Sequence, residues 1–140
     1  MREEGHAAIE LALAVGVLLL PVAIVVTGFG PWSERRVEAE AMAAEAARAA
    51  VLDLSHEAGH GVVSSMTSAL GIPDGLVRVG WCGADPAEAP SGACVFERGA
   101  VVSVAVELWT PLVATPWGSL GGLWVVGEHS EPIDLYRSLG

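Results

Sequence analysis

One apolar run near the N-terminus constrains this chain more than any other feature. From Ala7 to Val26 the only charged residue is Glu10. A run of about twenty residues has the length that a helix needs to cross the hydrocarbon core of a bilayer. A lone carboxylate within such a helix is costly, so Glu10 is a candidate functional residue that needs a partner. The sequence therefore predicts a transmembrane helix in which one charge has a role.

Three interpretations of residues 1–30 compete. A secretory signal peptide would have a basic start and a small-residue cleavage site, but Met1–Glu4 is not clearly basic and Val25–Gly28 matches such a site poorly. In a plain membrane anchor, Glu10 would reach the headgroups from one end of the span. The third interpretation is a pilin-type segment that is cut between Gly5 and His6.

The pilin-type interpretation gives Glu10 a physical role. Cleavage after Gly5 would leave His6 with a free α-amine, which is positively charged at neutral pH. When such helices pack side by side, the Glu10 carboxylate of one subunit can meet the amine of its neighbour. Pairing removes much of the cost of a buried charge, and a shifted register leaves that charge unpaired. Glu10 is therefore expected to set the register of assembly.

These residues carry a resemblance to a known family. Gly5, Glu10 and the Leu20-Pro21 pair, followed by an Ala-, Glu- and Arg-rich stretch, resemble type IV prepilins and, more closely, TadE-like minor pilins of the tight-adherence (Flp) pilus system. The tail from Glu131 to Arg137 is similar to the end of actinobacterial TadE-like proteins. The resemblance implies cleavage by a prepilin peptidase, and it implies other pilin subunits and the pilus assembly machinery as partners. It also implies a single-pass protein of the cytoplasmic membrane with its C-terminal part outside.

A second helix is predicted after the apolar run. Pro21 should kink the first helix, and Gly30-Pro31 should end it. Ser33 is a good N-cap for the next helix, which should extend to about Leu54. Its apolar face is predicted to contain Val37, Ala41, Ala44, Val51 and Leu52. This helix forms a stalk against neighbouring subunits, covers the chain's own sheet, or does both.

The C-terminal half has the pattern of a short helix followed by strands. Val62–Leu70 suits a helix that ends at Gly71 and Pro73. The apolar period then changes to two, which predicts strands over 76–82, 101–109 and 123–129. Residues 111–122 are expected to form a long apolar loop. In that loop Trp117, with Leu112 and Leu120, forms either a patch for a partner or a cover for the sheet.

The two cysteines, Cys82 and Cys94, flank a loop rich in Pro, Gly and Ser. Their spacing and context favour a disulfide formed outside the cytosol, and the alternative is two free thiols. A zinc site from these two residues alone lacks a second pair of ligands.

The segment His56-Glu57-Ala58-Gly59-His60 matches the H-E-x-x-H pattern of zinc hydrolases. On a regular helix the two histidines would share one face and could bind Zn²⁺, with Glu57 as general base. A catalytic site needs a third protein ligand, and His129, Glu128 and Glu131 have no spacing that indicates one. Gly59 and Gly61 also weaken a helix at this point. We interpret the match as a coincidence and predict no metal.

Together these patterns predict an α+β protein with a transmembrane pilin-type helix, a juxtamembrane helix and a small three-stranded antiparallel sheet. The predicted divisions are a leader over 1–5, an assembly helix over 6–30, a juxtamembrane helical region over 31–71 and an extracytoplasmic β-rich domain over 72–140. The net charge of −10 argues against nucleic acid as a partner. We expect a structural subunit of a pilus that has no catalytic residues, cofactor or small-molecule substrate. The alternatives are a membrane-anchored zinc hydrolase and an anchored protein without a filament role.

Overall fold

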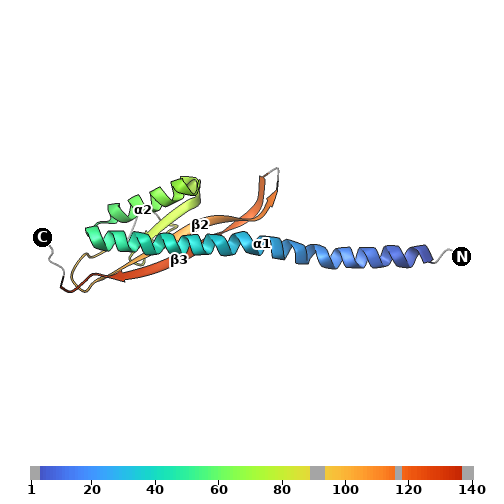
Figure 1. The fold of residues 1–140 in the computed structure, drawn as a ribbon, viewed down its shortest axis with the longest axis horizontal. Helices are drawn as coiled ribbons and strands as arrows, with labels where there is room; N and C mark the ends of the chain where they lie inside the picture. The colour runs from blue at the N-terminus through green and yellow to red at the C-terminus, as the bar shows by residue number, and fades with distance from the viewer. Residues whose placement is uncertain (1–3, 89–93, 116–117, 137–140) are drawn as a thin grey trace.

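The computed structural model describes residues 4–88, 94–115 and 118–136 of the 140-residue chain. Figure 1 shows a long helix, α1 (Glu4–Asp53), running almost the whole length of the molecule. A shorter helix, α2 (His56–Ala69), follows it, and a 3₁₀ turn over Asp74–Leu76 leads into the strands. These are β1 (Val77–Trp81), β2 (Val101–Thr115) and β3 (Gly118–Pro132). The α+β class with a three-stranded antiparallel sheet is therefore confirmed.

Helix α1 is continuous across the predicted break at Gly30-Pro31. Both Pro21 and Pro31 lie inside it, so the predicted stop is wrong. Ser33 is not an N-cap, because its hydroxyl donates a hydrogen bond to the Gly30 carbonyl oxygen within the helix (2.8 Å). A proline removes one backbone donor, and the helical residues on both sides of Pro31 outweigh that loss. The kink predicted at Pro21 stays a prediction.

None of the helices in the described part of the chain combines the length and the apolar character that crossing a bilayer requires. The transmembrane part of the fold prediction is therefore not confirmed.

The sheet has the order β1-β2-β3, with both pairs antiparallel. Strand β1 pairs from Val77, opposite Leu108, to Trp81, opposite Val104. Strands β2 and β3 pair along almost their full length, from Val101 with Pro132 to Thr115 with Gly118. The loop predicted over 111–122 is thus wrong for the most part, because both strands continue through it to form a long hairpin. Trp117 lies outside the described residues.

Pro111 is tolerated in β2 because of where β1 ends. Strand β1 pairs with β2 no further than Leu108, so β2 has a free edge beyond that point. Proline lacks a backbone donor and is found on strands that have such an edge. Pro111 therefore costs the sheet no ladder bond to β1.

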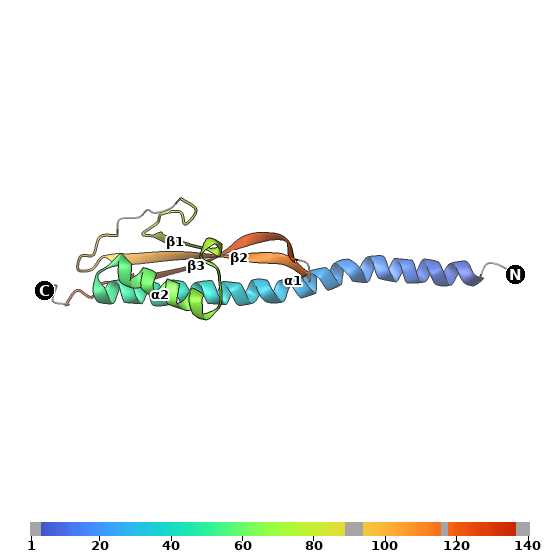
Figure 2. The same ribbon diagram turned by 90° about the horizontal axis from the view of Figure 1, so that it is seen from above.

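Both helices cover the same face of the sheet, as Figures 1 and 2 show. Helix α1 lies across β2 and β3, and α2 packs against α1. The alternation predicted for β2 is confirmed, because Val102, Val104, Val106 and Leu108 are buried beneath α1. Burying these side chains is the main source of the stability of this domain.

The face of α1 that meets the sheet differs from the predicted one. Val37 and Leu52 are 65% and 57% exposed, and Ala41 is exposed as well, whereas Val51 is buried as predicted. The buried face contains Ala39, Met42, Ala43, Ala46, Ala47 and Ala50. Because most of these side chains are single methyl groups, the helix backbone lies close to the strands. The part of α1 after Ala39 therefore covers the chain's own sheet. This was one of the two roles predicted for the helix.

The disulfide between Cys82 and Cys94 is confirmed, with their Cα atoms 5.3 Å apart. It closes the segment that leaves the end of β1. By the chain-entropy relation, a loop of this size contributes about 3 kcal/mol to stability.

Two buried threonines allow a matched test of the core. Thr110 and Thr67 are each 2% exposed. The Thr67 hydroxyl donates to the Ser64 carbonyl (3.0 Å), whereas the Thr110 hydroxyl has no hydrogen-bond partner among the described residues. Thr110→Val should raise the free energy of unfolding by about 1 kcal/mol, because it removes a buried polar atom that has no partner.

Thr67→Val is the matched control and should lower the free energy of unfolding by about 1 kcal/mol. Guanidinium unfolding of the full chain in mild detergent, followed by tryptophan fluorescence, measures both changes. Equal effects of the two substitutions would contradict this account of the Thr110 hydroxyl.

Candidate functional site: the exposed half of helix α1

The N-terminal half of α1 projects beyond the sheet with apolar side chains on all sides. Figures 1 and 2 show this half extending away from the rest of the molecule. Its large apolar side chains are between 47% and 69% exposed. They are Ile9, Leu11, Leu13, Val15, Val17, Leu18, Leu19, Leu20, Val22, Val25, Val26 and Phe29. A helix that is apolar all round is normally buried, so this half lacks a covering surface.

Polar residues begin where the sheet begins to cover the helix. Arg35 pairs with Glu38 (2.8 Å) and Arg36 pairs with Glu40 (3.0 Å), each within one turn or so of α1. The Arg36 guanidinium also lies 6.0 Å from the centre of the Trp32 ring. These pairs are exposed or half-exposed, and such pairs contribute little to stability. They mark the boundary between the apolar half and the solvated half of α1.

Glu10 lies within the projecting half, and its side chain is exposed. Gly5 and His6, the predicted processing residues, belong to the first turn of α1. The structure thus places Gly5, His6, Glu10 and Pro21 on one helix, separate from the sheet. A carboxylate at Glu10 would have to find a positive partner if this half became buried against another apolar surface.

The two histidines of the H-E-x-x-H match lie on the first turns of α2. Ser55 caps this helix by accepting a hydrogen bond from the Glu57 backbone N–H (3.1 Å). His56 and His60 share a face, as the spacing predicts, but the Nε2 atom of each ring already accepts a hydrogen bond. The Trp81 indole N–H donates to His60 Nε2 (2.9 Å), and the Cys94 backbone N–H donates to His56 Nε2 (3.3 Å).

Aromatic contacts complete this cluster. The His56 ring meets Trp81 and Phe96 edge-on, with ring centres 5.1 and 4.9 Å apart. The His60 ring lies 5.2 Å from Trp81. Burial lowers the pKa of His60 from its ordinary value, and the neighbouring His56 imidazole lowers it further. The two hydrogen bonds to Nε2 atoms join α2 to Trp81, just before Cys82, and to Cys94.

This geometry gives the zinc interpretation no support. A metal would compete for the Nε2 atoms that accept hydrogen bonds from Trp81 and Cys94. Glu57 is exposed, and His129 makes its contact with Glu131 on β3 (3.2 Å). Among the described residues no three His, Cys, Asp or Glu side chains are grouped closely enough to hold a metal ion.

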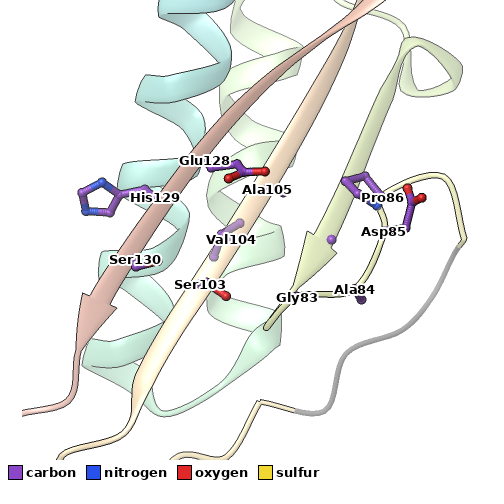
Figure 3. Close-up of a pocket in the computed structure, with 11 residues that line it drawn as sticks. Gly83, Ala84, Asp85, Pro86, Ser103, Val104, Ala105, Glu128, His129 and Ser130 are labelled. Atoms are coloured by element: carbon purple, nitrogen blue, oxygen red, sulfur yellow. The ribbon is translucent and has the colours of Figure 1, made fainter.

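A groove of about 340 Å³ lies on the face of the sheet away from the helices. It runs between the turn after β1 and the strands β2 and β3, as Figure 3 shows. The Glu128 side chain lies over Ala105, whereas the imidazole of His129 points away. The Asp85 carboxylate already accepts a hydrogen bond from the Ala87 N–H (2.8 Å). This combination of groups indicates no reaction.

Sequence reasoning missed the residues that matter most for packing. Trp81 lies in the strand predicted over 76–82 and is buried, but nothing in the sequence indicated His60 as its hydrogen-bond partner 21 residues away. The patch predicted around Trp117 is not tested, although Leu112 is 52% exposed. A second cluster of aromatic residues lies on the outer face of the sheet, where the Trp109 ring meets the Trp124 ring. The Arg78 guanidinium carbon lies 3.8 Å from the centre of the Trp124 ring.

No protein-family model matches this chain, and neither curated proteins nor solved structures give a match. The TadE-like resemblance therefore stays a prediction from the N-terminal motif and the tail.

Proposed function

We propose that this chain is a pilin-like structural subunit of the TadE-like, minor-pilin type. In this proposal the projecting half of α1 packs against the same half in neighbouring subunits. A prepilin peptidase cuts the chain after Gly5, and the subunit contributes to the assembly of a Flp-type pilus. No reaction is assigned to it.

The observation that carries this proposal is the exposed apolar surface of the projecting half of α1. The described large apolar side chains between Ile9 and Phe29 are exposed on every side of the helix. No soluble globular protein gains by presenting that much apolar surface to water. Several parallel copies of the helix would cover one another, and such a bundle is the core of a pilin filament.

Glu10 gives the packed helices a defined register. Within a bundle of apolar helices its carboxylate would be removed from water, which is costly unless a positive group is close. The α-amine that cleavage creates at His6 is such a group, and it belongs to the same end of the helix. One stagger between neighbouring helices brings amine and carboxylate together, and other staggers leave both unpaired.

Membrane retention before assembly is part of the proposal. Its support is the same run of exposed apolar side chains, since lipid is the other medium that can cover them. The disulfide between Cys82 and Cys94 favours a location outside the cytosol for the sheet. We therefore place the sheet and α2 on the outer side of the cytoplasmic membrane.

Substitution of Glu10 tests the register role. Glu10→Ala should leave the amount of folded protein unchanged and lower the subunit's recovery in sheared filaments by tenfold or more. Glu45→Ala is the matched control, because Glu45 is an exposed carboxylate of the same helix that pairs with Arg48 (3.2 Å). Quantitative immunoblotting of sheared and cell-bound fractions gives the ratio. Equal recovery of the Glu10→Ala and wild-type subunits would refute the register role.

The N-terminal residue of the mature protein separates the proposal from a plain anchor. N-terminal sequencing of the protein extracted from membranes or filaments should begin at His6. A chain that begins at Met1 keeps its leader and has no amine at the position that Glu10 requires. That result would leave the anchored protein without a filament role as the better description.

A further inference from the structure

We propose that His56 and His60 form an acid-sensitive latch, which holds the disulfide-bonded edge of the sheet against α2 at neutral pH and releases it in mild acid. The latch is defined by four residues: the two histidines of α2, Trp81 at the end of β1, and Cys94. This inference does not depend on the proposed pilin function.

The geometry makes both histidines acceptors. Trp81 precedes Cys82, and its indole N–H donates to His60 Nε2 (2.9 Å). The backbone N–H of Cys94 donates to His56 Nε2 (3.3 Å). The two hydrogen bonds therefore attach both ends of the disulfide segment to one face of α2. An N–H group can donate only to an unprotonated nitrogen, so each bond requires a neutral imidazole.

Protonation turns both acceptors into donors. A protonated His60 would present an N–H to the Trp81 N–H, and the bond between them would be lost. The His60 ring is only partly covered and can turn toward water, but Trp81 is 4% exposed. Its indole N–H would then be buried without an acceptor, which is unfavourable. Protonation of His60 therefore weakens the contact between α2 and β1.

The surrounding charges do not offset this loss. The charged residues on the elements packed around the two rings are Glu45, Arg48 and Asp53 of α1, Glu57 of α2, Arg78 of β1, and Asp85, Glu88, Glu97 and Arg98 beside the disulfide. All of them except Arg78 are exposed, so solvent screens their effect. Arg78 lies on the other face of the sheet, 3.7 Å from Glu107. A second positive imidazole beside the first would add repulsion.

The direction of the pH effect follows from linkage. The pKa of His60 is lowered in the folded chain, chiefly by burial, so the folded chain binds this proton less readily than the unfolded chain. The bond from Trp81 to His60 is therefore fully formed above about pH 6.5, the ordinary pKa of histidine, and weakens as the pH falls below that value. For each proton that the open form binds and the closed form does not, the opening equilibrium constant changes by at most about tenfold per pH unit.

An NMR titration of the full ¹⁵N-labelled chain in detergent micelles tests the latch directly. Between pH 7.5 and 5 the Trp81 indole N–H and the Cys94 amide should both shift and begin to exchange faster with water. His60→Gln should remove the Trp81 transition, because a glutamine oxygen can accept the bond without titrating. His129→Gln is the control and should leave both transitions in place.

Reduction of the disulfide gives a second, independent measurement. At pH 5.5 a phosphine reductant should cleave Cys82–Cys94 several-fold faster in the wild type than in the His56→Gln/His60→Gln variant, and at pH 7.5 the two rates should agree. The comparison at equal pH cancels the reductant's own pH dependence. Constant wild-type NMR signals down to pH 5 would overturn the proposal. Stoichiometric zinc in the purified chain would also overturn it, because both Nε2 atoms would then bind metal.

Discussion

Replacing Gly127 with alanine is expected to lower the free energy of unfolding by about 3 kcal/mol, a cost at the upper end for overpacked sites. Gly127 lies on β3 directly beneath α1. A Cβ atom added there would be 2.6 Å from the Ala39 carbonyl oxygen and would also clash with the backbone of Glu40. Both neighbours are helix backbone, so no side chain can move aside and α1 must shift away from the sheet.

Ser130→Ala is the matched control for this substitution. Ser130 is an exposed residue of the same strand, three positions later and on the opposite face. Its replacement should change the free energy of unfolding by less than about 0.5 kcal/mol. Chemical unfolding of the full chain in mild detergent compares the two variants. A Gly127→Ala variant as stable as Ser130→Ala would show that α1 does not lie this close to β3.

Two glycines of α2 should respond to alanine in opposite directions. A Cβ on Gly59 would clash with the Trp81 ring and lie 2.8 Å from the Ala46 carbonyl oxygen, so Gly59→Ala should destabilise the protein by about 2 kcal/mol. A Cβ on Gly61 would meet no atom within 4 Å. Gly61→Ala should therefore stabilise the protein by about 0.5 to 1 kcal/mol, because alanine is the better helix former.

The pair shares a helix, a residue type and a substitution, so the sign alone decides the outcome. Thermal unfolding followed by near-ultraviolet circular dichroism, which reports on the packing around Trp81, is the suitable measurement. If Gly59→Ala were stabilising as well, the close contact of α2 with α1 and Trp81 would be disproved.

The strands could be predicted because their pattern is local. In β2, Val102, Val104 and Val106 alternate with smaller or more polar residues, and that alternation alone fixes the buried face. The ends of the hairpin could not be predicted in this way. Pro111 and Gly122 are poor strand residues, yet they pair with each other because the rest of β2 and β3 brings them together. Tertiary pairing outweighs local propensity at such positions.

The predicted end of the first helix and the predicted buried face of the next were both wrong, for a related reason. Rules for helix ends treat Gly30-Pro31 as a stop, but they take no account of the helical residues on both sides. The prediction of the buried face gave most weight to the largest side chains, which led to Val37 and Leu52. In the structure the sheet selects the alanine face instead, because Gly127 and single methyl groups allow the closest approach. Which face meets the sheet depends on a strand about 80 residues later, which no local pattern reveals.

In the candidate site, too, local features could be predicted and contacts between distant segments could not. The sequence alone identified the apolar run and Glu10, because length and charge are properties of one continuous segment. It also identified the two cysteines as a pair. It could not identify the use of His56 and His60, because their partners lie on β1 and beside Cys94. A five-residue motif gives the spacing of side chains along a helix, but the surrounding fold determines what those side chains bind.

The unbroken course of α1 has a mechanical consequence. A helix of 50 residues is about 75 Å long. Because it is continuous, a rotation of one end about the helix axis also rotates the other end. In the proposed filament, packing of the projecting half among neighbouring subunits would also fix the direction in which the sheet faces around the helix axis. The helix bends most easily at Pro21 and Pro31, because each proline lacks the backbone N–H of a helical hydrogen bond. If a filament of this kind is pulled, bending of α1 should concentrate at Pro31, so that the sheet tilts as a unit while the packed half keeps its orientation.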